Sequence, residues 1–240
     1  MSYNALDYWE KRLSEHFSLV GTGHLGFSER YNRIAYARKV AVLDKQIAQR
    51  GIDIGICNIL DIGSGNGFFI DYYLSRGALA VTGVDITEKS VSELRNKFPA
   101  CRFHRLDIGR ETLSVGEEFA IINAFDVLYH IVEDDEFVFA AKTIGLSLRR
   151  GGWVFITDAL SEKFADSPHV RYRDLESYRT ALSQTGVEIE SVVPIMWMLS
   201  APLPFPGGIV DVFAPLWYAM DSIYCPANGS RMSLLICRKK

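Results

Sequence analysis

The stretch that most constrains the fold is residues 59–67, which read Ile-Leu-Asp-Ile-Gly-Ser-Gly-Asn-Gly. An apolar run leads into an acid, three alternating glycines follow, and a second apolar run begins at Phe68. This pattern predicts a buried strand that turns sharply into a helix, because glycine accepts positive φ angles and lets the backbone approach a ligand closely. The free N–H groups that begin the next helix then face the turn. The stretch therefore predicts a nucleotide-binding turn.

The glycine spacing separates two kinds of nucleotide site. A dinucleotide fingerprint, G-x-G-x-x-G, would need glycine at position 68, which is Phe68. The chain instead carries D-x-G-x-G-x-G starting at Asp61, and Asp85 ends the next apolar run (Ala-Val-Thr-Gly-Val). These residues resemble the class I S-adenosylmethionine-dependent methyltransferases, and the resemblance covers about residues 55–160.

The resemblance implies an α/β, Rossmann-like class I methyltransferase fold. Its seven-stranded sheet is expected to be mostly parallel, closed by an antiparallel hairpin and covered by helices on both faces. The implied cofactor is S-adenosylmethionine, with S-adenosylhomocysteine as product. Asp85 would accept hydrogen bonds from the ribose hydroxyls, and Asp107 would contact the adenine amino group. The cofactor-binding residues so implied are Asp61, Gly63, Ser64, Gly65, Gly67, Asp85, Ile86, Asp107, Ile108, Asp126 and Tyr31.

Length and charge limit the domain count and the partners. A chain of 240 residues can form one sizeable α/β domain with additions, but not two comfortable ones. We expect residues 1–50 to form an N-terminal helical lid and residues 51–240 the methyltransferase core, with an apolar insertion at about 196–230. The net charge is −3 and the only basic run is at residues 238–240, so nucleic acid is not a favoured partner.

Cysteine usage indicates the compartment. Cys57, Cys101, Cys225 and Cys237 lie far apart and form no C-x-x-C motif. Three of them fall in predicted strands, where a free cysteine behaves as a small hydrophobe. We expect a reduced, cytoplasmic protein, and the polar, acidic N-terminus predicts no signal peptide.

A glycine-rich break divides residues 3–50 into two predicted helical segments. Aromatic and apolar residues recur at near-helical spacing over residues 8–17, and residues 31–49 are again helical in pattern. Between them, Gly-Thr-Gly-His24, followed by Tyr31 and Tyr36, resembles small-molecule methyltransferases of bacterial biosynthetic clusters, in which such a segment folds over the cofactor. Under this resemblance Tyr31 contacts cofactor and His24 contacts substrate. The alternative is packing for the tyrosines and a surface loop for His24.

Alternating apolar segments predict the remaining strands and helices. Further strands are expected at residues 80–85, 102–106, 119–124 and 153–157, and helices at 68–76, 87–97, from about 133 to 149, and 175–185. Residues 187–195 and 231–238 are expected to form the closing antiparallel hairpin.

The stretch after the fourth predicted strand, Asp126-Val-Leu-Tyr129-His130, resembles the family's post-strand motif beside the transferable methyl group. Methyl transfer depends mainly on alignment and exclusion of water, but an oxygen acceptor of high pKa must still lose a proton. His130 is the expected general base, because imidazole suits proton transfer near neutrality. His24, His169 and Tyr129 are the competitors, and a structural hydrogen-bonding role for His130 stays open.

Acceptor specificity is expected in the residues after Asp158. If extended, the segment 169–173 places His169, Arg171 and Arg173 on one side, and two guanidiniums near a pocket would suit a carboxylate, a phosphate or sugar hydroxyls. A solvated loop is the alternative. The expected substrate-binding residues are His24, Tyr129, His169, Arg171 and Trp197.

The apolar insertion is unusual in composition. From residue 192 to 220 the only charge is Asp211, and five prolines (Pro194, Pro202, Pro204, Pro206 and Pro215) are expected to prevent a continuous helix. A transmembrane segment is therefore not expected. Three roles stay open for this aromatic-rich segment: a cap over an apolar acceptor, a homodimer interface, or peripheral contact with a membrane surface.

The expected function is methyl transfer to a small-molecule acceptor, with oxygen as the favoured nucleophile and a natural product, sugar or aromatic acid as substrate. One alternative is a methyltransferase for a lipid-linked or membrane-embedded acceptor, and a second is a non-catalytic regulatory protein that binds the cofactor. No metal site is expected, because Asp158 is followed by Ala159 rather than by the Asn that metal-dependent catechol-type sites carry.

Overall fold

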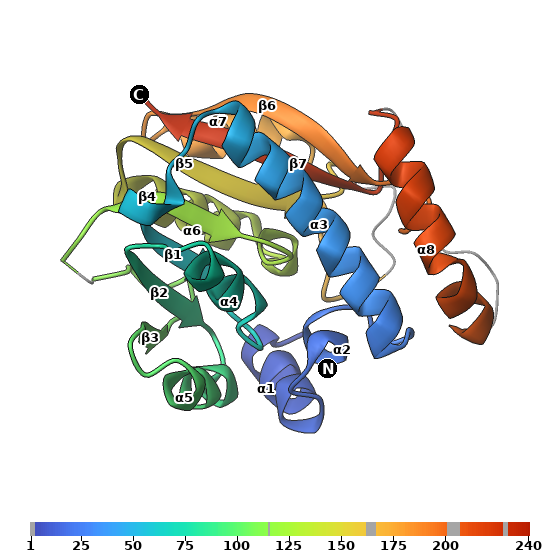
Figure 1. Ribbon diagram of the computed structural model, residues 1–240. Coiled ribbons are helices and arrows are strands. Elements are labelled where there is room, and N and C mark those ends of the chain that lie inside the picture. Colours follow the sequence, from blue (N-terminus) through green and yellow to red (C-terminus); the bar gives the residue numbers. More distant parts are fainter. Residues whose placement is uncertain (1–2, 115, 162–166, 201–206, 228–229) are drawn as a thin grey trace.

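A seven-stranded sheet forms the centre of the protein. The computed structural model describes residues 3–114, 116–161, 167–200, 207–227 and 230–240. The strand order is β3-β2-β1-β4-β5-β7-β6 (Figure 1). The strands are β1 Asn58–Ile62, β2 Ala80–Asp85, β3 Arg102–Arg105, β4 Phe119–Ala124, β5 Leu148–Asp158, β6 Val187–Met196 and β7 Met232–Lys239. All run parallel except β7, which is antiparallel to both β5 and β6. The predicted sheet and its closing hairpin are confirmed.

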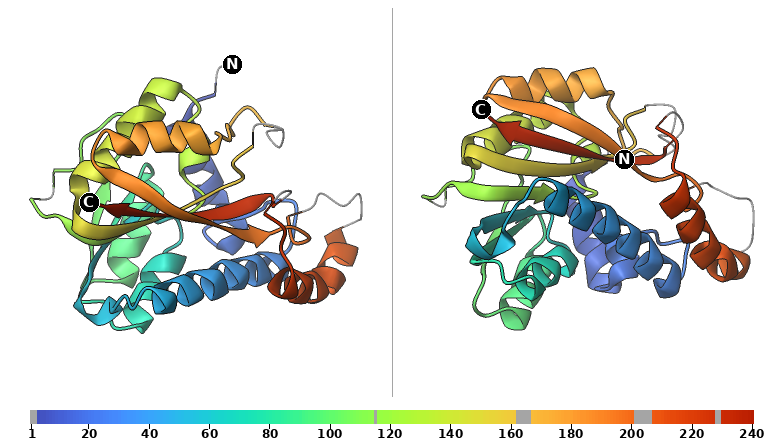
Figure 2. Two further views of the ribbon diagram at one scale, coloured as in Figure 1. Left: turned by 90° about the horizontal axis from the view of Figure 1, so that it is seen from above. Right: turned by 45° about the horizontal axis from the view of Figure 1, so that its top comes forward.

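Helices cover both faces of this sheet. Figure 2 shows α6 and α7 on one side and α3, α4 and α5 on the other. The helices are α1 Ala5–Glu15, α2 Leu19–Thr22, α3 Glu29–Gln49, α4 Phe68–Ser75, α5 Glu88–Lys97, α6 Asp134–Ser147, α7 Leu175–Ser183 and α8 Gly207–Ile223. Two short 3-10 turns, η1 Ile54–Ile56 and η2 Leu128–His130, complete the described secondary structure.

Alternation along the strands divides the core into two layers. Successive strand residues point to opposite faces, so Ile59 packs with the residues of α3 and α4, whereas Leu60 packs with those of α6 and α7. Ile121 and Ile122 of β4 divide in the same way. Both layers are apolar because the central parallel strands are buried on both faces. The carboxyl ends of β1, β2 and β4 consequently meet at one edge of the sheet, where open α/β sheets bind ligands.

One expectation about the insertion is wrong. Pro215 lies inside the 17-residue helix α8, although its ring and missing N–H disfavour an interior position. Pro215 is exposed, whereas α8 packs through Val210, Ala214 and Trp217, which are buried. Pro202, Pro204 and Pro206 lie outside the described residues. None of the helices in the described part of the chain has the length and apolar character that crossing a membrane requires.

Candidate functional site

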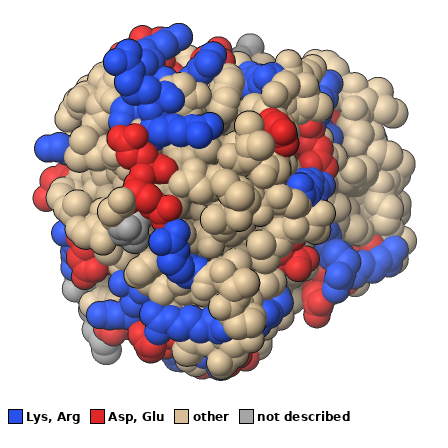
Figure 3. Space-filling view, turned by 60° about the vertical axis from the view of Figure 1, so that its left-hand side comes forward, with Lys and Arg blue, Asp and Glu red and all other residues tan. Residues whose placement is uncertain are grey.

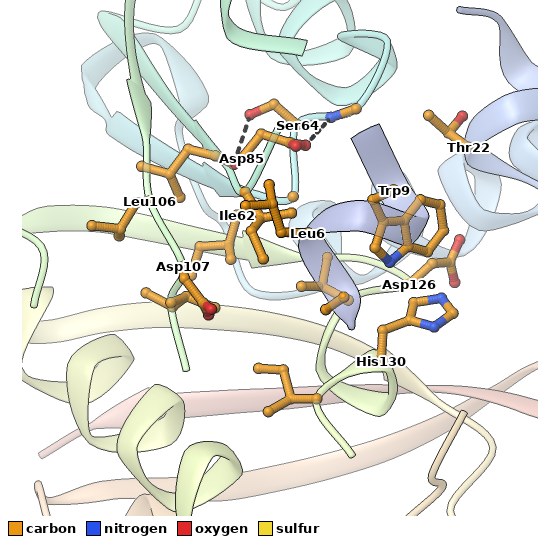
Figure 4. Close-up of a pocket in the computed structure, with 18 of the residues that line it drawn as sticks. Leu6, Trp9, Thr22, Ile62, Ser64, Asp85, Leu106, Asp107, Asp126 and His130 are labelled. Carbon is orange, nitrogen blue, oxygen red and sulfur yellow. Dashed lines mark hydrogen bonds between the residues drawn. The ribbon is translucent and has the colours of Figure 1, made fainter. Parts of the chain in front are cut away.

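A cavity of about 480 Å³ opens where β1, β2 and β4 end. Its walls come from the glycine turn after β1, from the ends of β2 and β3, and from residues 125–127 after β4. Tyr3, Asn4 and α1 line a further side of it, with Leu6 and Trp9 among the α1 residues. Figure 4 shows an elongated space with Asp85 and Asp107 toward one end and Trp9, Asp126 and His130 at the other. The cavity therefore connects segments that are distant in the sequence, from α1 to the residues after β4.

Glycine is required at two positions of the turn. Gly63 and Gly65 have φ angles of +69° and +51°, a region that side chains rarely adopt. A Cβ on Gly63 would lie 2.3 Å from Cγ2 of Val127, and one on Gly65 would lie 2.5 Å from Cγ2 of Thr22. The turn consequently lines the cavity and is tightly enclosed by neighbouring side chains.

Asp85 connects the end of β2 to this turn. Its Oδ2 accepts from the Gly65 backbone N–H at 2.8 Å, and its Oδ1 accepts from the backbone N–H and the hydroxyl of Thr87 at 2.9 and 2.7 Å. Burial raises the pKa of the Asp85 carboxyl, and these hydrogen bonds lower it. Asp85 lines the cavity with a carboxylate of fixed orientation.

Asp107 lies at the far end of the cavity, after β3. Its Oδ1 accepts from the Gly109 N–H at 3.0 Å, which closes a local turn. Partial burial raises the pKa of the Asp107 carboxyl. Ile108 and Ile86 provide apolar surface in the same cavity. This end can accept a flat polar ring whose exocyclic donor meets a carboxylate.

Asp126 is held in a strained conformation at the opposite end. Its φ is 61°, unusual for a residue with a side chain and often associated with functional sites. The Asp126 N–H donates to Thr157 Oγ1 at 2.8 Å, and the Thr157 hydroxyl donates to Asp126 Oδ1 at 3.0 Å. The Lys39 ammonium of α3 forms an ion pair with Asp126, and the two side chains are only 7% and 11% exposed. The pair is thus largely removed from water.

His130 lines the same end of the cavity. Its Nδ1 lies 2.8 Å from the backbone carbonyl oxygen of His169. A carbonyl only accepts, so we assign the proton to Nδ1, which leaves a lone pair on Nε2. Loss of hydration lowers the pKa of His130 to about 4, while the bond to the carbonyl raises it. The ring is enclosed by Trp9, with centroids 4.8 Å apart, and by the His169 ring at 5.6 Å.

The cavity brings together nine of the residues named from the sequence. These are Gly63, Ser64, Gly65, Asp85, Ile86, Asp107, Ile108, Asp126 and His130.

The structure places other named cofactor residues elsewhere. Asp61 is buried within β1, where the Asn123 amide donates to it at 2.6 Å and burial raises its pKa to about 7. Gly67 is the N-cap of α4. Tyr31 is buried and its hydroxyl donates to the backbone carbonyl of Leu199. Tyr36, five residues further along α3, lines the cavity instead.

The arginines expected to bind acceptor have protein partners. Arg171 lies 2.8 Å from Asp134, and the buried Arg173 lies 3.2 Å from the same carboxylate. Both also donate to the carbonyl of Val132, just before α6. The two guanidiniums do lie on one side, as alternation predicted, but they bind the start of α6 rather than lining the cavity.

The remaining acceptor candidates also lie outside the cavity lining. His24 is in an exposed loop, where its Nδ1 accepts from the Gly26 N–H at 3.2 Å. Tyr129 is buried against Tyr172 and His130. Trp197 lies beside Tyr224. His169 contacts His130 through its backbone carbonyl and through its stacked ring.

Two basic residues of the site were missed from the sequence. Lys39 pairs with Asp126 across 87 residues of chain, and nothing distinguishes it from other lysines on a helical face. Arg12 donates from Nε to the Gly21 carbonyl at 2.7 Å and from Nη2 to that of Gly23. It also lies over the Trp9 ring, 4.7 Å from the centroid. The helical repeat that contains Trp9 indicates this face of α1. No pattern in the sequence indicates that Arg12 binds the carbonyls of the glycine break.

Comparison with known proteins agrees with this geometry. Residues 59–152 match the family model described as a methyltransferase domain. A tRNA U34 carboxymethyltransferase of Alteromonas mediterranea is 32% identical over 103 residues, which are 40% of this chain. The match spans only 30% of that relative's length.

Solved structures resemble nearly the whole chain. The N-methyltransferase NodS of Bradyrhizobium japonicum, in complex with S-adenosylhomocysteine, has a TM-score of 0.66 at 15% identity, covering 99% of both chains. Magnesium protoporphyrin IX methyltransferase of Synechocystis, with bound S-adenosylmethionine, has a TM-score of 0.65 at 16% identity, covering 100% of this chain and 99% of that one. The [4+2]-cyclase SpnF has a TM-score of 0.56 at 21% identity, covering 82% and 79%. At these identities the likeness establishes the fold.

Proposed function

We propose that the protein transfers a methyl group from S-adenosylmethionine to a small-molecule acceptor, because residues 59–152 match a methyltransferase domain and the whole chain shares the fold of S-adenosylmethionine-dependent methyltransferases. The observation that carries the proposal is the single cavity that connects Asp85 and Asp107 with His130. A long cavity of this kind suits a cofactor bound at one end and an acceptor brought to the other.

The residues present fit this cofactor. Asp107 and Ile108 would hold the adenine, and Asp85 the ribose, because both carboxylates line the cavity as hydrogen-bond acceptors. The turn at Gly63 and Gly65, which lines the cavity without side chains, would lie against the methionine part. When bound, the cofactor supplies an electrophilic methyl group on a sulfonium sulfur.

The chain's contribution to the reaction is positioning, exclusion of water and proton removal. Leu6 and Trp9 of α1 line the cavity and would shield it from solvent. Arg12 fixes α1 to the glycine break, so this cover has a defined place. The Nε2 of His130 would accept the proton of an acceptor hydroxyl during transfer. Its low pKa keeps the ring in the free-base form at neutral pH.

Oxygen is the acceptor atom that we propose, with a natural product, sugar or aromatic acid as the substrate class. An uncharged histidine at the cavity end can accept the proton that an oxygen nucleophile must lose. Nitrogen is the alternative, since NodS is an N-methyltransferase. We do not propose that the apolar insertion caps the acceptor, because no described residue beyond Glu136 lines the cavity.

A tRNA acceptor is not proposed. The tRNA-modifying relative matches only part of this chain, and the net charge of −3 gives no general attraction to phosphates. On the face shown in Figure 3, basic and acidic side chains are interspersed rather than gathered by sign. A cytoplasmic location remains part of the proposal, and the position of a fluorescent fusion in living cells tests it.

Calorimetry tests the proposed cofactor. Wild-type protein is expected to bind S-adenosylmethionine and S-adenosylhomocysteine and not NAD. Asp85→Ala should lose most of this affinity, whereas Asp71→Ala, which removes an exposed acid of α4 outside the cavity, should retain it. Equal affinity for NAD, or no binding of either methionine-derived molecule, would overturn the proposal. Transfer of a labelled methyl group to phenolic, sugar and amine acceptors then identifies the acceptor atom.

A further inference from the structure

One side of α8 exposes large apolar side chains along its whole length. Val212, Leu216 and Ile223 are 67%, 54% and 87% exposed. We call the set the α8 outer face; its members are Ile209, Val212, Phe213, Leu216, Met220, Ile223 and Tyr224. Contiguous apolar surface of this kind is rare on soluble monomers and marks an interaction site.

The opposite side of α8 already has a partner. Val210, Ala214 and Trp217 are buried, and α8 packs against α3 at the edge of the molecule (Figures 1 and 2). Asp221, on the same side, accepts from the backbone N–H groups of residues 197–199. The helix is thus fixed by its inner side, and its outer face is not needed for that attachment.

The spacing of the outer face is that of a helix-packing seam. Ile209, Val212, Leu216, Ala219 and Ile223 follow one another in steps of three, four, three and four. These are the a and d positions of a heptad pattern, which packs against another helix. A 17-residue helix is about 26 Å long, so the seam offers two and a half such repeats.

We propose that the α8 outer face binds the α8 outer face of a second copy of this chain. In a two-fold dimer one patch meets itself, so any net charge on it would repel its own copy. The charged residues of α8 are Asp211 and Asp221; Asp211 accepts from the Ser28 hydroxyl at 2.5 Å, and Asp221 is buried. The exposed side chains of the outer face are uncharged, so self-association meets no such repulsion.

The same charges disfavour a membrane as the occupant. Helices that lie on membrane surfaces carry Lys and Arg, which attract anionic lipid. Helix α8 contains neither, and both of its charged side chains are acids. Leu216, at the centre of the seam, would lie near its own copy whether the two helices ran parallel or antiparallel.

Sedimentation velocity on the full chain tests the dimer. Wild-type protein should be dimeric, and Val212→Glu with Leu216→Glu should raise the dissociation constant at least tenfold. The control is Leu79→Glu, which adds one glutamate at a leucine that is 70% exposed and outside α8, and it should remain dimeric. A Leu216→Cys variant should form a disulfide-linked dimer on mild oxidation, whereas Leu79→Cys should not.

The outcomes separate the dimer from its alternatives and from the proposed activity. A wild-type monomer at every concentration would overturn the dimer. Flotation of a monomer with phosphatidylcholine vesicles would assign the outer face to a membrane instead. If the double variant does not fold, Ile223→Glu replaces it, because the Ile223 side chain is 87% exposed. This variant should unfold at the wild-type temperature and should also weaken the dimer. Cofactor affinity should be the same in wild type and in the glutamate variants.

Discussion

The imidazole of His130 donates from Nδ1 to the backbone carbonyl of His169 at 2.8 Å. This bond connects the turn after β4 to the segment that precedes α7, and it selects the tautomer with a free Nε2. The two rings also stack, with an interplanar angle of 11°. The Tyr8 hydroxyl is within hydrogen-bonding distance of the His169 ring, 3.2 Å from its Nε2. His169 therefore acts on the site as a positioning residue.

We expect His130→Gln to lower methyl transfer to an oxygen acceptor by about 10²- to 10⁴-fold, the usual contribution of a general base. Cofactor affinity should not change. Because the pKa of His130 is lowered to about 4, the wild-type rate should stay level as pH falls through 6.5 and decline only near pH 4. Rate measurements across this range check both points.

The control for this prediction is His16→Gln, at an exposed histidine after α1, which should behave as wild type. Unchanged turnover in His130→Gln would remove His130 from the mechanism. An acid limb near pH 6.5 that disappears in the variant would show that His130 titrates as an ordinary histidine.

We expect Lys39→Met to destabilise the protein by about 3–5 kcal/mol, because removing one partner of a buried pair leaves the other charge unpaired. The double variant Lys39→Met with Asp126→Asn should recover part of that loss. Urea unfolding of the wild type, both single variants and the double variant gives the coupling energy. Additive effects of the two changes would show that the pair contributes nothing beyond its separate members.

Asp61→Asn should change how stability depends on pH. Burial raises the pKa of Asp61 to about 7 from an ordinary 3.8, so between those values the folded state holds a proton that the unfolded state has released. Wild-type stability should therefore fall as pH rises through this window, by up to about 1.4 kcal/mol per pH unit. The asparagine variant should lack that slope. Unfolding free energies from pH 4 to 7 test this, and parallel curves for the two proteins would contradict it.

Gly65→Ala should abolish cofactor binding and destabilise the fold by more than the about 1–2 kcal/mol that a left-handed conformation costs a residue with a side chain. The matched control is Gly77→Ala, where φ is +76° and a Cβ would meet nothing within 4 Å. Gly77→Ala isolates the cost of the backbone conformation, and the difference between the two variants measures the contact with Thr22. Calorimetric binding and thermal unfolding provide the two readouts, and retained cofactor affinity in Gly65→Ala would show that the turn does not meet the ligand closely.

The predictable part of the site is local in sequence. Glycine spacing, Asp85 at a strand end and the stretch ending in His130 each follow from a strand and the turn directly after it. Parallel strands then bring those turns to one edge of the sheet, because their carboxyl ends coincide. This is why nine of the named residues meet in a single cavity without any knowledge of side-chain packing.

The part of the site that the sequence does not predict depends on contacts between distant segments. The sequence allows Arg171 and Arg173 a ligand or a solvated loop, and in the structure both bind the carboxylate of Asp134. Tyr31 and Tyr36 both lie on α3, but Tyr36 lines the cavity whereas Tyr31 donates to the carbonyl of Leu199. Periodicity identifies a helical face, but it does not identify the surface that the face will meet.

The sequence by itself determined the sheet, the turn after β1 and the acids at the strand ends, since each depends on neighbouring residues and on the alternation of apolar positions. Only the tertiary structure decided which charged groups are neutralised inside the protein. Lys39 forms an ion pair with Asp126, and Arg12 donates to a carbonyl of the glycine break. The His169 carbonyl accepts from His130 Nδ1 and so determines the tautomer of that ring. These contacts join segments between 9 and 87 residues apart, and burial gives them their effect, because a charge or a proton position matters most where water cannot compensate for it.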